Sequence, residues 1–120
     1  MSTFTPAPVK PLIPFAALEA IDIRVGTITA AADVASSRKL ARLTVSFGDH
    51  VRTILAGLCQ ERADLAVLVG MQALFVVNLE PRKMAGEISE GMLFDIGYAD
   101  GVTPVLATPE KAVPDGTRAG

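Results

Sequence analysis

The chain has 120 residues with a net charge of -2, and half of its residues are apolar. This length fits one domain, the apolar half supplies a core and excludes global disorder, and the slight acidic excess excludes a chain-wide basic field. One cysteine and one histidine exclude an internal disulfide and a multi-cysteine or multi-histidine metal site. This weakens most hydrolase interpretations, and we predict no cofactor and no catalytic residues.

The N-terminal segment carries four prolines within its first 14 residues. It lacks the basic region followed by an apolar region that marks a secretory signal. No span of the chain approaches the ~18–20 apolar residues that a membrane helix needs. We therefore predict a flexible, proline-rich arm over residues 1–14, one domain over residues 15–120, no membrane partner and a cytoplasmic location.

The domain is expected to begin with helical turns and a long strand. Residues 15–20 contain good helix formers, but the stretch is short for a stable helix. Residues 21–34 alternate between apolar and polar side chains with a period of two, which predicts a strand. Gly26 indicates a bulge or a bend within that strand. Residues 35–39 then form a polar loop.

A hairpin follows the polar loop. Residues 40–47 alternate between outward polar and inward apolar positions, and residues 51–57 form the partner strand. Gly48 and Asp49 are the predicted turn pair. The arginines of both strands should leave the core in this register.

In the second half of the domain, the sequence pattern predicts a short helix and further strands. Residues 60–70 have helical composition and end at Gly70. Residues 71–79 and residues 90–98 are apolar runs that predict two strands, joined by a polar segment. Residues 101–108 offer one more short strand before a turn-rich tail.

Five curled strands with a short helix between the third and the fourth are the plan of the OB-fold, an all-β Greek-key barrel. Binding in that fold uses the face of strands two and three together with the loops after strands one and four. The two polar segments, around residues 35–40 and 78–92, fall at those loops. Eight polar residues in and beside them are therefore the candidate binding residues: Arg38, Lys39, Arg42, Arg52, Asn78, Arg82, Lys83 and Ser89.

These residue types suit a nucleic acid. Arginine and lysine bind phosphates, whereas asparagine and serine contact base edges or sugar hydroxyls. An ordinary solvated face is the alternative for the charged residues, and Asn78 is also a usual turn residue. Glu80, Glu87 and Glu90 lie among the candidates and oppose a polyanion, which favours shape-selective binding over a tight nonspecific one.

Several motifs carry a family resemblance: "DIRVGTI", "KLARLTVSFGD", "RTILAGL", "LVGMQALFVVNLEPRKMAGEISEGMLF" and "PDGT". Together they resemble the stand-alone tRNA-binding domain family, which includes the C-terminal appendage of some bacterial methionyl-tRNA synthetases. The secretion chaperone CsaA is a close sister. The resemblance covers residues 15–120, and residues 78–92 are its most specific part.

The resemblance implies an OB-fold that dimerises through its helical turns and its C-terminal segment. It also implies tRNA binding by structure more than by sequence, without catalysis. By position, the binding residues of the family fall on Lys39, Arg52, Asn78, Arg82, Lys83 and Ser89.

The chain departs from its relatives in places. It has "SRKL" where tRNA-binding relatives often have "ADKL", and "NLEPRK" and "SEGM" where CsaA-type chains usually have "NFPPR" and "SEVL". These marks favour a homodimeric, noncatalytic, structure-selective tRNA-binding protein, with an aminoacyl-tRNA synthetase as a possible further partner. The alternative is a CsaA-like export chaperone that binds unfolded polypeptide, which requires exposed apolar surface. Leu58, Met84 and Met92 are the candidates for that surface, and a position in the core is the competing interpretation for each.

Overall fold

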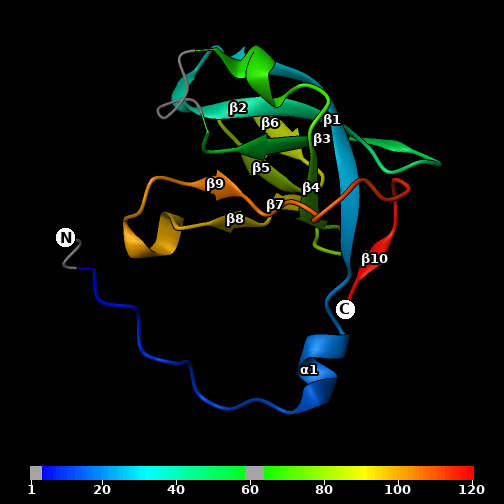
Figure 1. The fold of residues 1–120 in the computed structure, drawn as a ribbon. Coiled ribbons are helices and arrows are strands. Elements are labelled where there is room, and N and C mark those ends of the chain that lie inside the picture. The colour runs from blue at the N-terminus through cyan, green and yellow to red at the C-terminus, as the bar shows by residue number, and fades with distance from the viewer. Residues whose placement is uncertain (1–3, 59–63) are drawn as a thin grey trace.

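The computed structural model describes residues 4–58 and 64–120, and Figure 1 shows its fold. Strands dominate it, and a six-stranded antiparallel sheet forms the body of a curled barrel, in the order β3-β2-β1-β4-β7 with β10 beside β1. This architecture confirms the predicted all-β fold of OB type. The elements are α1 (Phe15–Glu19), β1 (Ile23–Val34), β2 (Ser37–Ser46), β3 (Val51–Ala56), η1 (Leu65–Leu68), β4 (Gln72–Val76), β5 (Arg82–Met84), β6 (Glu87–Ser89), β7 (Met92–Leu93), β8 (Asp95–Ile96), η2 (Tyr98–Asp100), β9 (Val105–Leu106) and β10 (Arg118–Ala119).

Strand β1 lies in the middle of the sheet. Its first half pairs with β4, and its second half pairs with β2. The register shifts between Ile28 and Ala30, so the predicted irregularity lies beyond Gly26. Gly26 serves another purpose, since a Cβ there would lie only 2.6 Å from Val45 Cγ1 and 2.8 Å from Phe47 Cε1. Only glycine lets the core side chains of β2 approach β1 this closely.

The hairpin of β2 and β3 has the predicted register. Ala41, Leu43 and Val45 are buried, while the intervening residues of β2 are partly exposed. The Phe47 amide donates to the His50 carbonyl oxygen at 2.9 Å, which leaves Gly48 and Asp49 as the two turn residues. The inward residues join a core cluster that includes Ile28, Ile54, Leu58, Leu68, Phe75 and Leu93.

The helix predicted over residues 60–70 is shorter than expected in its described part, and residues 60–63 lie outside the described residues. A single 3₁₀ turn, η1, follows Asp64, whose side chain accepts from the Ala66 amide at 2.9 Å. The turn buries Leu68, and Gly70 ends it with a φ of 91°. Leu65 of the same turn is partly buried and packs against the core beside Leu68.

The polar segment after β4 is more regular than a loop. It folds into a hairpin of β5 and β6, with Ala85 (φ 49°) and Gly86 (φ 81°) at its tip. The single strand predicted over residues 90–98 is two short strands, β7 and β8, which pair with β4 and β9 respectively. The predicted strand at residues 101–108 is reduced to β9.

The N-terminal arm and α1 extend away from the barrel (Figure 1). Helix α1 confirms the predicted helical turns, and residues 4–14 form no helix or strand and are exposed. Leu12 in this arm is 97% exposed. Among the described residues, no helix is long and apolar enough to span a membrane.

Candidate nucleic-acid-binding surface

The two polar segments predicted to form the site lie against each other. Ser36, in the turn between β1 and β2, donates its hydroxyl hydrogen to the Ala85 carbonyl oxygen at the tip of the β5–β6 hairpin, at 2.8 Å. A second connection is the ion pair of Arg42 on β2 with Glu87 on β6, in which Nη1 lies 3.0 Å from both carboxylate oxygens. The fold therefore joins segments that are far apart in the sequence.

Four exposed basic residues lie at this junction: Arg38 and Lys39 at the start of β2, and Arg82 and Lys83 on β5. Within the described part of the chain, their charged groups form no ion pair and no side-chain hydrogen bond. Strand β2 begins at Ser37, so Arg38 and Lys39 are strand residues and not the loop residues that the sequence predicted. We call these four residues the cation patch.

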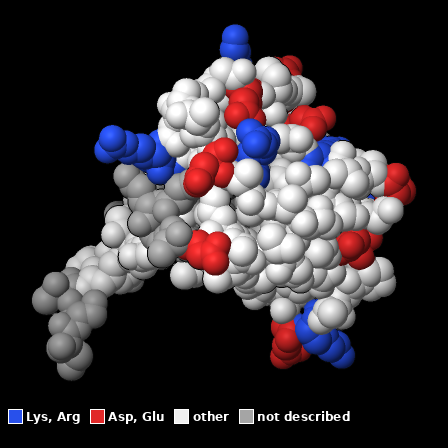
Figure 2. Space-filling view, turned by 90° about the horizontal axis from the view of Figure 1, so that it is seen from above, with Lys and Arg blue, Asp and Glu red and all other residues white. Residues whose placement is uncertain are grey.

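The patch is local. Basic and acidic side chains are interspersed on the face shown in Figure 2, so no field of one sign covers it. Arg42 adds little to the patch, because Glu87 neutralises its guanidinium. The same ion pair neutralises Glu87, one of the glutamates that were expected to repel a polyanion. Four exposed cations without internal partners are therefore the chemistry available to phosphates here.

Arg52 has a different environment from the cation patch. Its Nη1 donates to the carbonyl oxygens of Val77, at 2.6 Å, and Glu90, at 3.0 Å, and its Nε donates to His50 Nε2 at 3.0 Å. These contacts connect β3 to the segments that flank the β5–β6 hairpin. Arg52 therefore holds the hairpin in place with most of its donors already used.

Asn78 and Ser89 also have hydrogen-bond partners within the protein. Asn78 Oδ1 accepts from the Asp22 amide at 2.8 Å, and its Nδ2 donates to the Ala20 carbonyl oxygen at 2.7 Å, which connects β4 to the end of α1. Ser89 is only 3% exposed. Its hydroxyl accepts from the Leu55 amide at 3.0 Å and donates to the Gly91 carbonyl oxygen at 2.9 Å.

We call Arg52, Asn78 and Ser89 the bonded set. Burial removes Ser89 from any surface that an RNA could contact, so this candidate differs from the expectation that it faces the ligand. The patch comes from the two polar segments, whereas the bonded set combines Asn78 and Ser89 of the second segment with Arg52 of β3. The difference between side chains with and without hydrogen-bond partners becomes visible only in three dimensions.

A groove lies beside the cation patch, with a volume of about 460 Å³. It runs between the start of β2, the end of β3, β5, β7 and η2. Lys39 and Arg82 line it, whereas Arg38 and Lys83, the adjacent residues on the same two strands, do not. Its other lining residues are Leu40, Leu55, Ala56, Gly57, Leu58, Met84, Met92, Leu93, Phe94, Asp95 and Tyr98.

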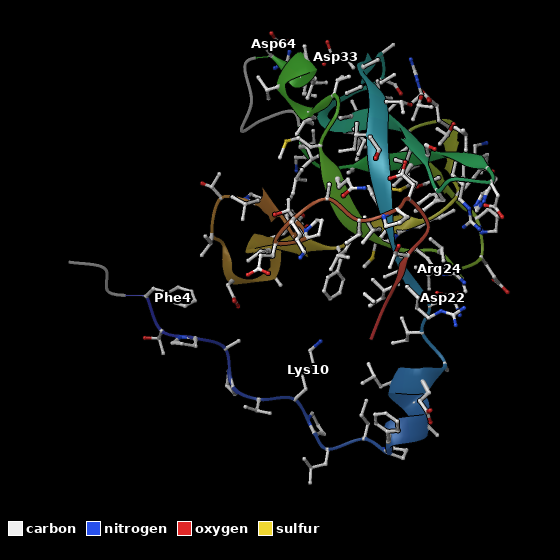
Figure 3. The ribbon with its side chains drawn as sticks, turned by 45° about the vertical axis from the view of Figure 1, so that its right-hand side comes forward. Phe4, Lys10, Asp22, Arg24, Asp33 and Asp64 are labelled. Atoms are coloured by element: carbon white, nitrogen blue, oxygen red, sulfur yellow. The ribbon has the colours of Figure 1, made fainter. Side chains whose placement is uncertain are left out.

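A second, polar cavity of about 320 Å³ contains paired charges. Asp22 accepts from Arg24 Nε at 2.8 Å and from Arg118 Nε at 3.2 Å, and the hydrogen bond from Arg24 lowers the pKa of Asp22. The hydrogen bond from His50 likewise lowers the pKa of Asp49. Figure 3 shows Asp22 and Arg24 together at one end of β1. Because these charges are matched internally, this cavity offers less to an external anion than the cation patch does.

The sequence placed Phe94 and Tyr98 near the candidate site without indicating a stacking role, and the structure makes both part of the groove wall. Phe94 and Tyr98 follow the predicted fourth loop in the sequence. They line the same groove as Lys39 and Arg82 of the patch. The available signal was the scarcity of aromatic residues, since two of six lie here. Metal binding has no support in residues 4–58 and 64–120, where no cluster of three or more His, Cys, Asp or Glu side chains could hold an ion.

Residues 23–118 match the model of the protein family described as "Putative tRNA binding domain". The chain belongs to this family. The methionine–tRNA ligase of Parabacteroides distasonis is 38% identical over 110 residues, which are 92% of this chain and 16% of the ligase. That of Methanothrix thermoacetophila is 42% identical over 107 residues, which are 89% of this chain and 15% of the ligase. The chain thus spans less than a fifth of the length of these relatives.

Two solved structures resemble the whole fold. A methionyl-tRNA-synthetase-related protein from Pyrococcus horikoshii superposes with a TM-score of 0.84 at 30% identity, over 92% of this chain and 100% of that one. The chaperone CsaA from Bacillus anthracis superposes with a TM-score of 0.81 at 28% identity, over the same shares of the two chains. Both branches of the resemblance found in the sequence are therefore represented among proteins of this fold.

Proposed function

We propose that this chain is a noncatalytic domain that binds tRNA by its structure. The observation that carries the proposal is the cation patch: four exposed basic side chains, two from each of two strands, that have no partner in the described part of the chain. Phosphate contacts position a protein on a nucleic acid without reading its sequence. A patch of this kind therefore suits a folded RNA, whose backbone presents phosphates in a defined arrangement.

The proposal assigns binding and not catalysis. The family is described by tRNA binding, and the chain corresponds to less than a fifth of the methionine–tRNA ligases that it matches. The domain would act in the cytoplasm, either alone or beside an aminoacyl-tRNA synthetase to which it brings tRNA. Joining a weak RNA-binding domain to a catalytic one raises the effective concentration of the RNA at the enzyme.

The proposal includes a homodimer. The arm and α1 extend away from the barrel (Figure 1), and apolar side chains on them, among them Leu12, Phe15 and Leu18, are exposed. A second copy that covered them would remove this apolar area from water. Two cation patches on one particle would then bind one RNA together, which raises the apparent affinity without new contacts.

The groove supports a second candidate, a CsaA-like chaperone that binds unfolded polypeptide. Leu55, Leu58, Met84 and Met92 all line it, and methionine-rich apolar surfaces adapt to varied partners. In this case apolar side chains of the polypeptide would occupy the groove, and the cation patch would have a minor role.

One titration separates the two candidates. Folded tRNA, a single-stranded oligonucleotide and an unfolded apolar peptide are each titrated against the full chain over a series of salt concentrations. The tRNA-binding proposal predicts a steep fall of RNA affinity with salt and weaker binding by Arg82→Ala and Lys83→Ala. Lys111→Ala is the matched control, because it removes the same charge from an exposed position outside the patch. Salt-insensitive peptide binding with no RNA binding would overturn the proposal.

A further inference from the structure

The groove beside the cation patch has an apolar floor. Leu55 and Leu93 form part of this floor, and both are buried. Its volume of about 460 Å³ falls within the range of roughly 300–1,000 Å³ that is common for small-molecule sites. A flat ring system fits a site of this size and character better than a hydrated charged group does.

Two aromatic side chains at the wall remain accessible. Phe94 is 42% exposed and Tyr98 is 69% exposed. Such rings are platforms on which nucleobases stack in proteins that bind single-stranded nucleic acids. Tyr98 belongs to η2, whose flanking glycines, Gly97 and Gly101, have left-handed backbone conformations that form the tight turn holding the ring beside the groove.

The rim of the groove carries charge. Lys39 and Arg82 line it from β2 and β5, and neither has an ion-pair partner in the described part of the chain. Asp95 also lines the groove, and although its Oδ1 accepts from the Tyr98 amide at 3.4 Å, its carboxylate has further acceptor capacity for the amino group of a base. An occupant of the groove therefore combines an apolar, flat body with negative charge close to it.

We propose that the groove takes an unpaired nucleobase of an RNA single strand, stacked at Tyr98 and Phe94, while Lys39 and Arg82 hold the adjoining phosphates. This inference rests on the RNA-binding function proposed above and names the part of the RNA that enters the groove. An apolar peptide side chain would use the floor but leave both rim cations without a partner. A nucleotide can place its base on the apolar floor and against the two rings while its phosphate binds the cations of the rim.

Tyr98 is also the probe for the test. It is the only tyrosine of the chain, and the chain has no tryptophan, so tyrosine fluorescence reports on this groove alone. The full chain is titrated with a single-stranded RNA dodecamer, with a blunt RNA duplex of the same length, with inorganic phosphate and with an unfolded apolar peptide. The inference predicts strong quenching by the single strand, and little by the duplex or by phosphate. Quenching by the peptide but not by the single strand would overturn it in favour of a polypeptide occupant.

Two variants measure the contribution of the ring. Tyr98→Ala is expected to weaken binding of the single strand by about 5- to 100-fold and to leave the salt dependence unchanged, because no phosphate contact is lost. Tyr98→Phe should keep most of the affinity. Val67→Ala on η1 is the control, since this exposed side chain lies outside the groove. Circular dichroism of each variant confirms that the folded state is retained, as expected for a largely exposed side chain.

The outcomes distinguish this inference from the function on which it rests. If RNA binds with a steep salt dependence but without quenching, and Tyr98→Ala binds as tightly as the wild type, the nucleobase site is wrong and the tRNA-binding proposal stands. If neither folded tRNA nor the single strand binds at any salt concentration, the proposed function itself fails.

Discussion

The cation patch and the bonded set meet in the β5–β6 hairpin, where Arg82 of the patch lies opposite Ser89 of the bonded set, yet the surroundings of the two sets differ. Lys39 and Arg82 are exposed and have no partner among the described residues, whereas Arg52 has three acceptors and the Ser89 hydroxyl is bonded on both sides. A polar group with its hydrogen bonds satisfied inside the protein has little to offer a ligand. The patch therefore has free donors to offer a ligand, whereas the bonded set has few.

The bonded set explains how the patch keeps its shape. Among the described residues, the β5–β6 hairpin pairs with no strand of the main sheet, so side-chain contacts and the backbone hydrogen bond from the Glu90 amide to the Thr53 carbonyl oxygen, at 2.8 Å, hold its position. Arg52 and Ser89 connect it and its flanks to β3, and Arg42 and Ser36 connect it to β2 and the preceding turn. A rigid hairpin presents Arg82 and Lys83 in one arrangement, which binding by structure requires.

The largest expected effect comes from reversing the charge of the patch. Arg82→Glu combined with Lys83→Glu should reduce tRNA affinity by on the order of 100-fold at low salt, because two phosphate contacts are replaced by repulsion. The folded state should persist, since both side chains are exposed. Binding is measured by fluorescence anisotropy, and thermal unfolding serves as the control. A double variant that binds tRNA as the wild type does would remove the patch from the site.

A smaller effect on folding, and none on RNA contacts, is expected at Ser89. Ser89→Val leaves the Leu55 amide and the Gly91 carbonyl oxygen without this partner, which should cost about 1–3 kcal/mol of unfolding free energy. Urea denaturation measures the loss, and tRNA affinity of the folded fraction should change little. Loss of affinity with unchanged stability would instead make Ser89 a contact residue.

The smallest effect concerns pH. The hydrogen bond from Arg24 lowers the pKa of Asp22 below its ordinary value of 3.8 in the folded state. The contribution of this carboxylate to stability is therefore fully present above pH 3.8 and is lost as the pH falls through the lowered pKa. The melting temperatures of the wild type and of Asp22→Asn should differ by a constant amount at neutral pH and converge in acid. A difference that does not change with pH would contradict this assignment.

Much of the fold could be predicted from the sequence, because its strongest signals are local. The alternation of residues 40–47 and the Gly48-Asp49 turn define the β2–β3 hairpin, since a period of two places one face in the core. The β5–β6 hairpin was less visible, because its strands are only three residues long and its tip is Ala85-Gly86. Signals of this length do not distinguish a hairpin from a loop.

The sequence predicted where the candidate site lies in the fold, but not which of its residues are bonded within the protein. Fold-level reasoning placed both polar segments on the binding face, and their contact through Ser36 and Ala85 agrees with that placement. The role of each residue depends on long-range partners, such as the Ala20 carbonyl oxygen for Asn78. No pattern in one sequence reports on partners so far apart in the chain.

The most direct test of the comparison is the salt dependence of tRNA binding in two variants. The logarithm of the binding constant is plotted against the logarithm of the salt concentration for the wild type, for Lys39→Ala/Arg82→Ala/Lys83→Ala and for Asn78→Ala. Each lost phosphate contact reduces the slope by about one. We predict a slope lower by about three for the triple variant and an unchanged slope for Asn78→Ala. A wild-type slope in the triple variant, or a reduced slope in Asn78→Ala, would contradict the division into a cation patch and a bonded set.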